Sequence, residues 1–312
     1  MRRVVIEAGS RLHAGFHLVK ETLYNIEYAG AGFYSEQPRV VVEASECGDP
    51  HVQAPGEFHR IISRVVGKLP VRACVTLREA PPLHHGYGAT TQVSLATYHA
   101  LSLLAGRDPT PDELVKAGLH LLGRQEASTV GTILYAHGGF TVAPGVPAPR
   151  NPSPMILPIP EDWRLVIVQP ELRRGLHGAR ESEVLGNRTP PTERTRFMLS
   201  RGVHLLLVGM IRRDLNLALD GLRLMQTATG RYFSEAQGGT FRRDLARLVD
   251  EAQRDGIFLA QSSWGPTLYT IAPSDSADSD AKTLHLIASL IGLKARVIIS
   301  KPRNRGGGLT ES

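Results

Sequence analysis

The residues best suited to carry out chemistry form a glycine- and threonine-rich loop, residues 82–92, which leads into an apolar helical segment. Gly86 and Gly88 can adopt backbone angles closed to other residues, so successive N–H groups can point at one anion. The helix adds unpaired N–H groups and its positive dipole end. Thr90 and Thr91 are placed so that one caps the helix and the other binds an anion or a metal-bound phosphate oxygen. The pattern favours a phosphate or pyrophosphate site; the alternative is a glycine turn before a core helix.

Polar and titratable residues precede this loop in the chain. Ser10, Arg11 and His13 lie at the edge of an expected strand, where the arginine is difficult to bury without an anion. His13 is a catalytic candidate, with a hydrogen-bonded core histidine as the alternative. Within the loop itself, the pair His84 and His85 lies immediately before the glycines, and His85 could contact a phosphate, act as an acid or base, or cap the loop. These residues are therefore candidates for the wall of the same site.

The candidate metal ligands are Thr91 and Glu126. A glutamate carboxylate can hold Mg²⁺ while substrate phosphates complete its shell, so we expect Mg²⁺ as the cofactor. The alternative for Glu126 is a solvated helical glutamate. No H-E-x-x-H or similarly spaced ligand set occurs, so a protein-held zinc is not expected.

Two later loops also carry residues suited to binding a ligand. Residues 173–181 place three arginines around two glycines, and such a loop is difficult to order without anions. Residues 261–267 place small hydroxyl residues and a glycine just before an expected strand, where the backbone can approach a ligand closely. The candidate contacts in these loops are Arg174, which is also a catalytic candidate, Gly175, Arg180, Ser262, Ser263 and Gly265.

The composition is that of an ordinary globular protein, with 42% hydrophobic and 21% charged residues among 312. This length predicts two domains with a cleft between them. The apolar runs are too short to span a bilayer, and no signal peptide is apparent, so we expect a cytoplasmic protein without a membrane partner. Cys47 and Cys74 match neither a zinc pair nor a redox motif, which predicts two reduced thiols.

The net charge of +6 comes mostly from arginines, whose planar side chains suit phosphate and carboxylate groups. Nucleic acid would also explain a basic chain. However, the arginines are dispersed, and there is neither a run of five basic residues nor an aromatic-rich RNA-reading motif. The charge therefore favours a small anionic substrate over nucleic acid.

The elements expected around these residues fall into two halves. In the first, strands are predicted at 4–8, 9–18 with a bend, 39–44 and 71–77, and helices at 58–66, 93–104 and 110–122. Seven prolines in 144–160 indicate a connection between domains. In the second half, strands are predicted at 164–169, 266–271 and 295–300, and helices at 195–213, 215–225, 241–255 and 279–290. Residues 303–308 are a flexible tail or a loop that returns to the cleft.

The loop pattern P-x-x-x-G-x-G-x-T-T at 82–91, the early S-R-L-H at 10–13 and the late S-S-x-G-P-T at 262–267 resemble the three signature regions of the GHMP superfamily. Galactokinase, homoserine kinase and mevalonate kinase are among its members. Within it, the chain resembles the archaeal β-ribofuranosylaminobenzene 5′-phosphate synthase family. The closer resemblance adds residues 137–140, 174–178 and 301–304.

The resemblance implies an α+β, two-domain GHMP fold. Residues 1–158 would form a domain like domain 2 of ribosomal protein S5, with the phosphate-binding loop, and residues 159–312 a ferredoxin-like domain. It also implies condensation of phosphoribosyl pyrophosphate with 4-aminobenzoate or 4-hydroxybenzoate, with release of CO₂ and pyrophosphate, in tetrahydromethanopterin biosynthesis. Arg174 and Arg180 would hold the 5′-phosphate or the benzoate carboxylate. The phosphate loop would contribute Gly86, Gly88, Ala89, Thr90, Thr91 and Gln92.

Three departures bear on alternative functions. Tyr87 stands where the superfamily kinases usually have leucine, Ala89 where many have serine, and residues 128–140 contain no aspartate that could act as a base. These differences disfavour the first alternative, an ATP-dependent small-molecule kinase. The second is a non-catalytic RNA-binding protein with an S5-like domain, which the dispersed charge disfavours. A homodimer is the default expectation for the assembly.

Overall fold

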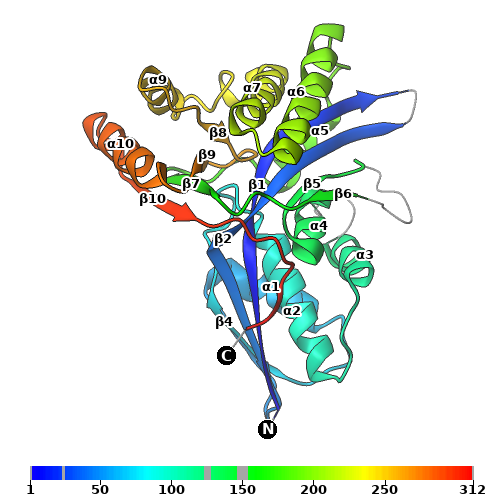
Figure 1. Ribbon diagram of the computed structural model, residues 1–312. Coiled ribbons are helices and arrows are strands. Elements are labelled where there is room, and N and C mark those ends of the chain that lie inside the picture. Colours follow the sequence, from blue (N-terminus) through cyan, green and yellow to red (C-terminus); the bar gives the residue numbers. More distant parts are fainter. Residues whose placement is uncertain (1, 23–24, 123–127, 146–153, 311–312) are drawn as a thin grey trace.

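The computed structural model describes residues 2–22, 25–122, 128–145 and 154–310 (Figure 1). A long antiparallel hairpin of β1 (Arg3–Glu21) and β2 (Ile26–Ser45) runs through the molecule and carries the first sheet. With β3 (Val52–Gln53), β4 (Cys74–Glu79) and β11 (Gly308–Leu309), the strand order is β11-β1-β2-β4-β3. The strand, bend and strand expected over residues 4–18 is one strand, β1, with register shifts at Ala8/Ser10, His13/Gly15 and Phe16/Leu18. Such bulges bend a strand and redirect its side chains, which bears on where Arg11 and His13 point.

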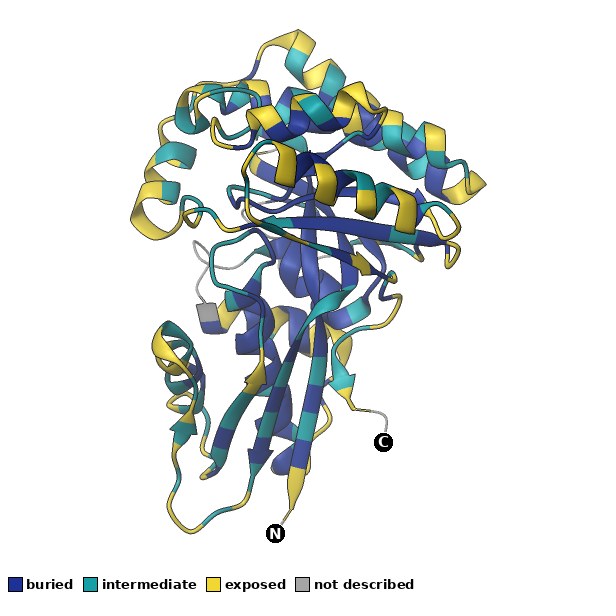
Figure 2. Ribbon diagram, turned by 90° about the vertical axis from the view of Figure 1, so that its left-hand side faces the viewer, coloured by how far each residue is buried: buried dark blue, intermediate teal, exposed yellow. Residues whose placement is uncertain are grey.

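The first sheet is completed by short strands and covered by helices. The remaining strands are β5 (Phe140–Val142) and β6 (Met155–Leu157). The helices are α1 (Gly56–Val66), α2 (Ala89–Leu104), α3 (Pro111–Leu122) and α4 (Thr129–His137). Helix α2 is buried along most of its length and shares one core with the first sheet and its neighbouring helices. The buried residues gather in the middle of the molecule (Figure 2). Its N-terminus is therefore held firmly by the core.

The second sheet has the antiparallel order β10-β7-β9-β8, formed by β7 (Trp163–Pro170), β8 (Ala260–Gln261), β9 (Leu268–Pro273) and β10 (Ala295–Ser300). Helices α6 (Glu193–Arg212), α7 (Leu215–Tyr232) and α9 (Ala246–Arg254) lie between β7 and β8 in the chain, and α10 (Ala277–Leu290) lies between β9 and β10. This β-α-β-β-α-β succession is the ferredoxin-like arrangement. The predicted α+β class is therefore confirmed.

The two faces of the second sheet bury different partners. Val166 and Val168 pack under α9 and α10. Leu165 and Ile167 face the hairpin and α7, in one core with Leu12 of β1. Because this core contains residues of both sheets, the sheets are joined by shared apolar burial as well as by the chain.

Several element predictions need correction. The polar helix α5 (Gly178–Gly186) overlaps and extends the loop predicted at 173–181, and the sequence does not predict the short helix α8 (Ser234–Gln237). Helix α9 begins only at Ala246. The tail returns to the first sheet, where Leu309 pairs with Ile6 and the buried Arg303 forms ion pairs with Glu7 and Glu36.

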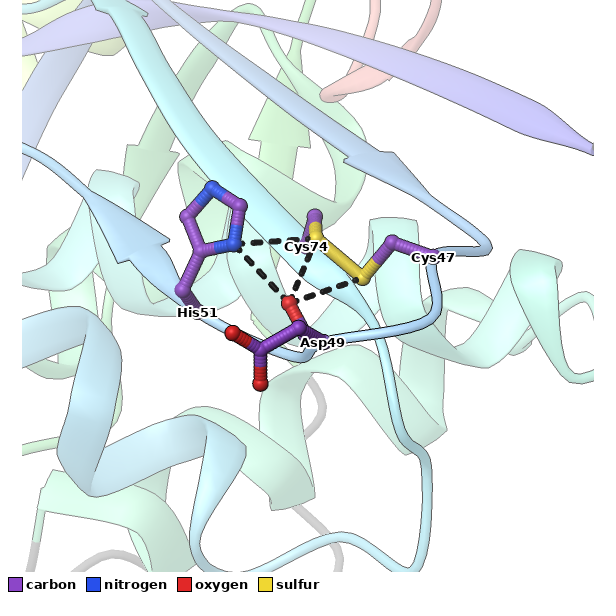
Figure 3. Close-up of a disulfide and its surroundings, with 4 residues drawn as sticks. All are labelled: Cys47, Asp49, His51 and Cys74. Atoms are coloured by element: carbon purple, nitrogen blue, oxygen red, sulfur yellow. Dashed lines mark hydrogen bonds between the residues drawn. A yellow bond between two sulfur atoms is a disulfide. The ribbon is translucent and has the colours of Figure 1, made fainter.

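The prediction of two reduced thiols is wrong, because Cys47 and Cys74 form a disulfide (Figure 3). Cys47 follows β2 and Cys74 begins β4, and the pairing of these strands brings the two Cα atoms to 5.8 Å. The Asp49 carbonyl oxygen lies 3.3 Å from Cys74 Sγ, and His51 Nδ1 lies 3.2 Å from the same sulfur. Strand pairing, which spacing in the sequence does not reveal, places the cysteines together.

The boundary predicted at 158/159 falls between β6, in the first sheet, and β7, in the second. The middle of the proline-rich connection lies outside the described residues, and so does Glu126. Among the residues that are described, no helix is long and apolar enough to cross a membrane.

Candidate functional site

The glycine loop joins β4 to α2 and has the backbone that its glycines predicted. Gly86 has a φ of +102° and Gly88 a φ of +67°, both in the region that favours glycine. Gly88 is the residue before the helix, and no side chain caps the helix there. The expectation that a threonine caps it is wrong, because the helix begins at Ala89 rather than at 93. Thr90 and Thr91 instead lie in its first turn, where backbone N–H groups lack helical acceptors.

Arg11 lies directly beneath this turn and is 8% exposed. Its backbone N–H donates to the Tyr87 carbonyl at 3.0 Å, and its Nη1 lies 3.4 Å from the Gly86 carbonyl oxygen. Its buried Nε has no hydrogen-bond partner within the described part of the chain. Burial lowers the pKa of Arg11 to about 10, an effect opposed by the nearby carboxylate of Glu181. The guanidinium therefore stays charged at neutral pH, and its Nε–H is an unsatisfied donor among the described residues.

Residues 262–265 of the second sheet pack against the glycine loop. Ser262 Oγ donates to the Gly86 carbonyl at 2.6 Å and accepts the His13 backbone N–H at 2.9 Å. A Cβ on Gly265 would overlap the backbone of His85 and Gly86, so only glycine allows this approach. Ser263 follows with a φ of +56°. The structure thus brings this loop, the glycine loop and β1 together, as the sequence motifs suggested.

The arginine- and glycine-rich segment joins the same assembly through its backbone. The Gly175 N–H donates to the His84 carbonyl at 2.8 Å, and a Cβ on Gly175 would overlap the carbonyl group of Trp264. Arg174 extends outward and pairs with Glu57 of α1 at 2.7 Å. Arg180 is exposed in the first turn of α5.

The two candidate catalytic histidines differ in their surroundings. His13 is buried, and its Nδ1 accepts the Gly15 N–H at 3.2 Å, which leaves the ring proton on Nε2. Burial, reinforced by Arg11, lowers the pKa of His13 to about 3, so its ring is neutral at physiological pH. The partly buried His85 places Nδ1 2.8 Å from the Leu83 carbonyl oxygen.

Some candidate ligand contacts have side chains already engaged inside the protein. Ser10 Oγ donates to the Pro38 carbonyl. Gln92 is fully buried; its Oε1 accepts the Tyr34 hydroxyl at 2.8 Å and its Nε2 donates to the Gly131 carbonyl at 3.0 Å. These residues hold the walls of the site in place.

The candidate metal ligands are not found together. Thr91 is buried near the start of α4, whereas Glu126 lies outside the described residues. Within the described ranges, no group of three or more histidine, cysteine, aspartate or glutamate side chains could hold a metal ion. The described chain therefore offers a hydroxyl near the first turn of α2 but no carboxylate cluster for Mg²⁺.

Glu181 and Trp264 lie in the two later loops, 173–181 and 261–267, but the sequence predicts a role for neither. Both stand next to the site: Glu181 is close enough to Arg11 to affect its pKa, and Trp264 carries the carbonyl that meets Gly175. The signal for Glu181 would have been an acidic residue beside three arginines. Arg242, whose guanidinium lies beside the Trp264 carbonyl, lies in no motif and could not have been found from the sequence.

Comparison with known proteins gives relatives and fold neighbours. Residues 206–285 match the family described as GHMP kinases C terminal. The chain is 28% identical over 254 residues to the β-ribofuranosylphenol 5′-phosphate synthase of Methanothermobacter thermautotrophicus, covering 74% of this chain and 71% of that protein. It is 25% identical over 317 residues to the protein of the same name from Archaeoglobus fulgidus, covering 95% and 96%.

Solved structures establish the fold. Homoserine kinase from Cytophaga hutchinsonii superposes with a TM-score of 0.70 at 15% identity, over 99% of this chain and 98% of that one. Mevalonate kinase from Methanococcus jannaschii gives a TM-score of 0.69 at 14% identity, over 96% and 98%. The GHMP fold and the resemblance to the archaeal synthases are confirmed.

Proposed function

We propose that this chain, a protein of the GHMP fold with archaeal synthases among its relatives, is a β-ribofuranosylphenol 5′-phosphate synthase. It would condense phosphoribosyl pyrophosphate with 4-hydroxybenzoate and release CO₂ and pyrophosphate. The observation that carries the proposal is similarity to the Archaeoglobus fulgidus synthase over 95% of this chain. The acceptor follows from chemistry, because a hydroxybenzoate that loses its carboxyl group leaves a phenol.

The site supports the first half of this reaction. When the bond between C1 of the ribose and the pyrophosphate oxygen breaks, both bonding electrons leave with the pyrophosphate. The first-turn N–H groups of α2 and the free Nε of Arg11 are suited to stabilise that added charge. Because Arg11 is buried, its charge is less screened by water than a surface charge would be.

The second half concerns the aromatic acceptor. The ring carbon that bears the carboxylate forms the new bond to C1, assisted by electron donation from the para hydroxyl group. Its bond to the carboxylate then breaks, CO₂ leaves, and the electron pair returns to the ring. Removing water from the carboxylate favours this loss, because the charge disappears in the product.

Mg²⁺ belongs to the proposal as an ion carried by the pyrophosphate oxygens. The described residues lack a carboxylate cluster beside Thr91, so no step above depends on a protein-held metal. The proposal also includes a cytoplasmic location and a homodimer. Light scattering of the purified protein measures its oligomeric state.

The deciding assay supplies the protein with Mg²⁺, phosphoribosyl pyrophosphate and carboxyl-labelled 4-hydroxybenzoate. We expect labelled CO₂ and pyrophosphate in equal amounts, with 4-aminobenzoate tested in parallel. Arg11→Gln should lower turnover by about 100-fold, the scale for losing a donor to a developing anion. Exposed Arg247→Gln is the control and should be unchanged. No CO₂ from either benzoate, with ATP consumed on an alcohol, would establish the kinase alternative instead.

A further inference from the structure

A second cationic site lies beside the glycine loop. A pocket of about 620 Å³ is lined by Arg174 and Arg180 from one segment of the chain and by Arg242, Arg243 and Asp244 from another. These segments are far apart in the sequence, and Trp264 also lines the pocket. Four arginines and one carboxylate make this a strongly basic hollow, which nothing in the proposed chemistry at the glycine loop requires.

Two of the arginines are held in place by the protein. Arg242 pairs with Asp244 at 2.6 Å and donates to the Arg173 carbonyl at 3.0 Å. Arg174 pairs with Glu57 at 2.7 Å. Such contacts fix a guanidinium before a ligand arrives, which reduces the entropy cost of binding.

The other two are not neutralised. In the described part of the chain, no carboxylate lies within ion-pair distance of Arg180 or Arg243. Guanidinium groups that line a pocket without a carboxylate partner among the described residues are suited to a phosphate, whose oxygens accept charge-assisted hydrogen bonds.

The pocket and the glycine loop are separated by one segment of backbone. Gly265 packs on the backbone of His85 and Gly86, while the adjacent Trp264 reaches the pocket and meets Gly175 through its carbonyl group. A ligand with an anionic group at each end could therefore occupy both sites at once. The pyrophosphate donor of the proposed reaction carries anionic groups at C1 and at C5.

We propose that the pocket lined by Arg174, Arg180, Arg242 and Arg243 binds the phosphate monoester of the substrate. This assignment rests on the proposed function for the identity of the ester, which is then the 5′-phosphate of the ribose donor. The acceptor carboxylate is a poorer occupant, because it is attached to the carbon that must reach C1, next to the departing pyrophosphate. The 5′-phosphate is unchanged in the reaction, so its binding energy can position the donor.

Calorimetry with ribose 5-phosphate, inorganic phosphate and pyrophosphate tests the pocket. The double variant Arg180→Gln/Arg243→Gln removes the two unpaired charges, and Arg247→Gln removes an exposed arginine of α9 outside the pocket. Ribose 5-phosphate should bind the double variant at least about tenfold more weakly, as expected from lost charge-assisted hydrogen bonds. Pyrophosphate affinity should stay within about twofold of wild type, and Arg247→Gln should bind all three probes normally.

Substitution by lysine separates charge from folding. Arg180→Lys/Arg243→Lys should recover part of the ribose 5-phosphate affinity, and thermal melting identifies any variant that is unfolded. Unchanged ribose 5-phosphate binding in the folded glutamine variant would overturn the assignment, and so would an equal loss in Arg247→Gln.

Failure of the pocket and failure of the proposed reaction give different results. If no CO₂ is released but the arginines still determine ribose 5-phosphate affinity, the pocket binds a phosphate monoester and the reaction is wrong. If CO₂ is released with an unchanged KM for phosphoribosyl pyrophosphate in the double variant, the reaction is right and the pocket assignment is wrong.

Discussion

Replacing Gly86 by alanine tests whether contact between the two sheets shapes the anion site. At a φ of +102°, a Cβ on Gly86 would lie 2.5 Å from the Ser262 carbonyl oxygen and 3.1 Å from the Ser262 Cβ. The first distance is far inside van der Waals contact with backbone, so no rotamer change can relieve it. The loop or residue 262 must shift, which would disturb the 2.6 Å hydrogen bond from Ser262 Oγ to the Gly86 carbonyl.

Gly86→Ala should lower the free energy of unfolding for two reasons. The left-handed backbone contributes about 1–2 kcal/mol for any residue with a Cβ. Overpacking against Ser262 adds about 1–3 kcal/mol. Gly292→Ala is the matched control, because Gly292 has a φ of +74° but nothing within 4 Å of its Cβ position. The difference between the two variants isolates the contact with Ser262.

Urea unfolding and calorimetry with pyrophosphate measure both consequences. Gly86→Ala should unfold at lower urea than Gly292→Ala and bind pyrophosphate at least about tenfold more weakly, because displaced N–H groups lose charge-assisted hydrogen bonds. Gly292→Ala should bind it as wild type does. Wild-type affinity in a folded Gly86→Ala variant would refute the idea that this loop's backbone forms the site.

Three further predictions concern charge and covalent links. Because burial lowers the pKa of Arg11 to about 10, pyrophosphate affinity should fall as the pH rises through 10, and Arg11→Gln should remove that step in calorimetric titrations. Burial, reinforced by His177, lowers the pKa of His84 to about 4, so the unfolded chain binds more protons than the folded one between pH 4 and 6.5. The thermal midpoint should therefore fall as the pH drops through this range, and less steeply in His84→Asn. An identical slope in the variant would contradict a role for His84. Reduction of the Cys47–Cys74 bridge, which closes a separation of 27 residues, should lower unfolding stability by about 3.5 kcal/mol, and detection of two free thiols in unreduced, denatured protein would show that no bridge had formed.

The sequence predicted local structure best where one residue type is strongly favoured for a backbone conformation, as glycine is for positive φ. Gly86 and Gly88 were expected to adopt unusual backbone angles, and both have positive φ. Predictions were also good for strands with continuous apolar runs, such as Ala295–Ser300. The glycine pattern thus located the loop, although it could not show that Arg11 lies under it.

Local patterns failed where a second element determines the structure. Helix α5 has no buried residue, so it lacks the apolar periodicity that identifies a helix. Thr90 and Thr91 were expected to cap or precede a helix, yet burial of α2 extends it back to Ala89. The disulfide depends on the pairing of β2 with β4, and the unpaired arginines of the pocket depend on two segments that meet only in the folded chain.

The contacts that build the anion site also join the two sheets. The Tyr269 hydroxyl, on β9, donates to the His13 carbonyl on β1 at 3.1 Å, and Ser262 links the same strand to the glycine loop. Large relative motion of the sheets would break these buried hydrogen bonds and uncover the core that contains Leu12 and Leu165. The first-sheet part of the chain alone lacks Ser262 and Gly265, the residues that hold the loop from the other side. Residues from both sheets therefore form the wall of the anion site, and anion binding there should depend on both halves of the chain.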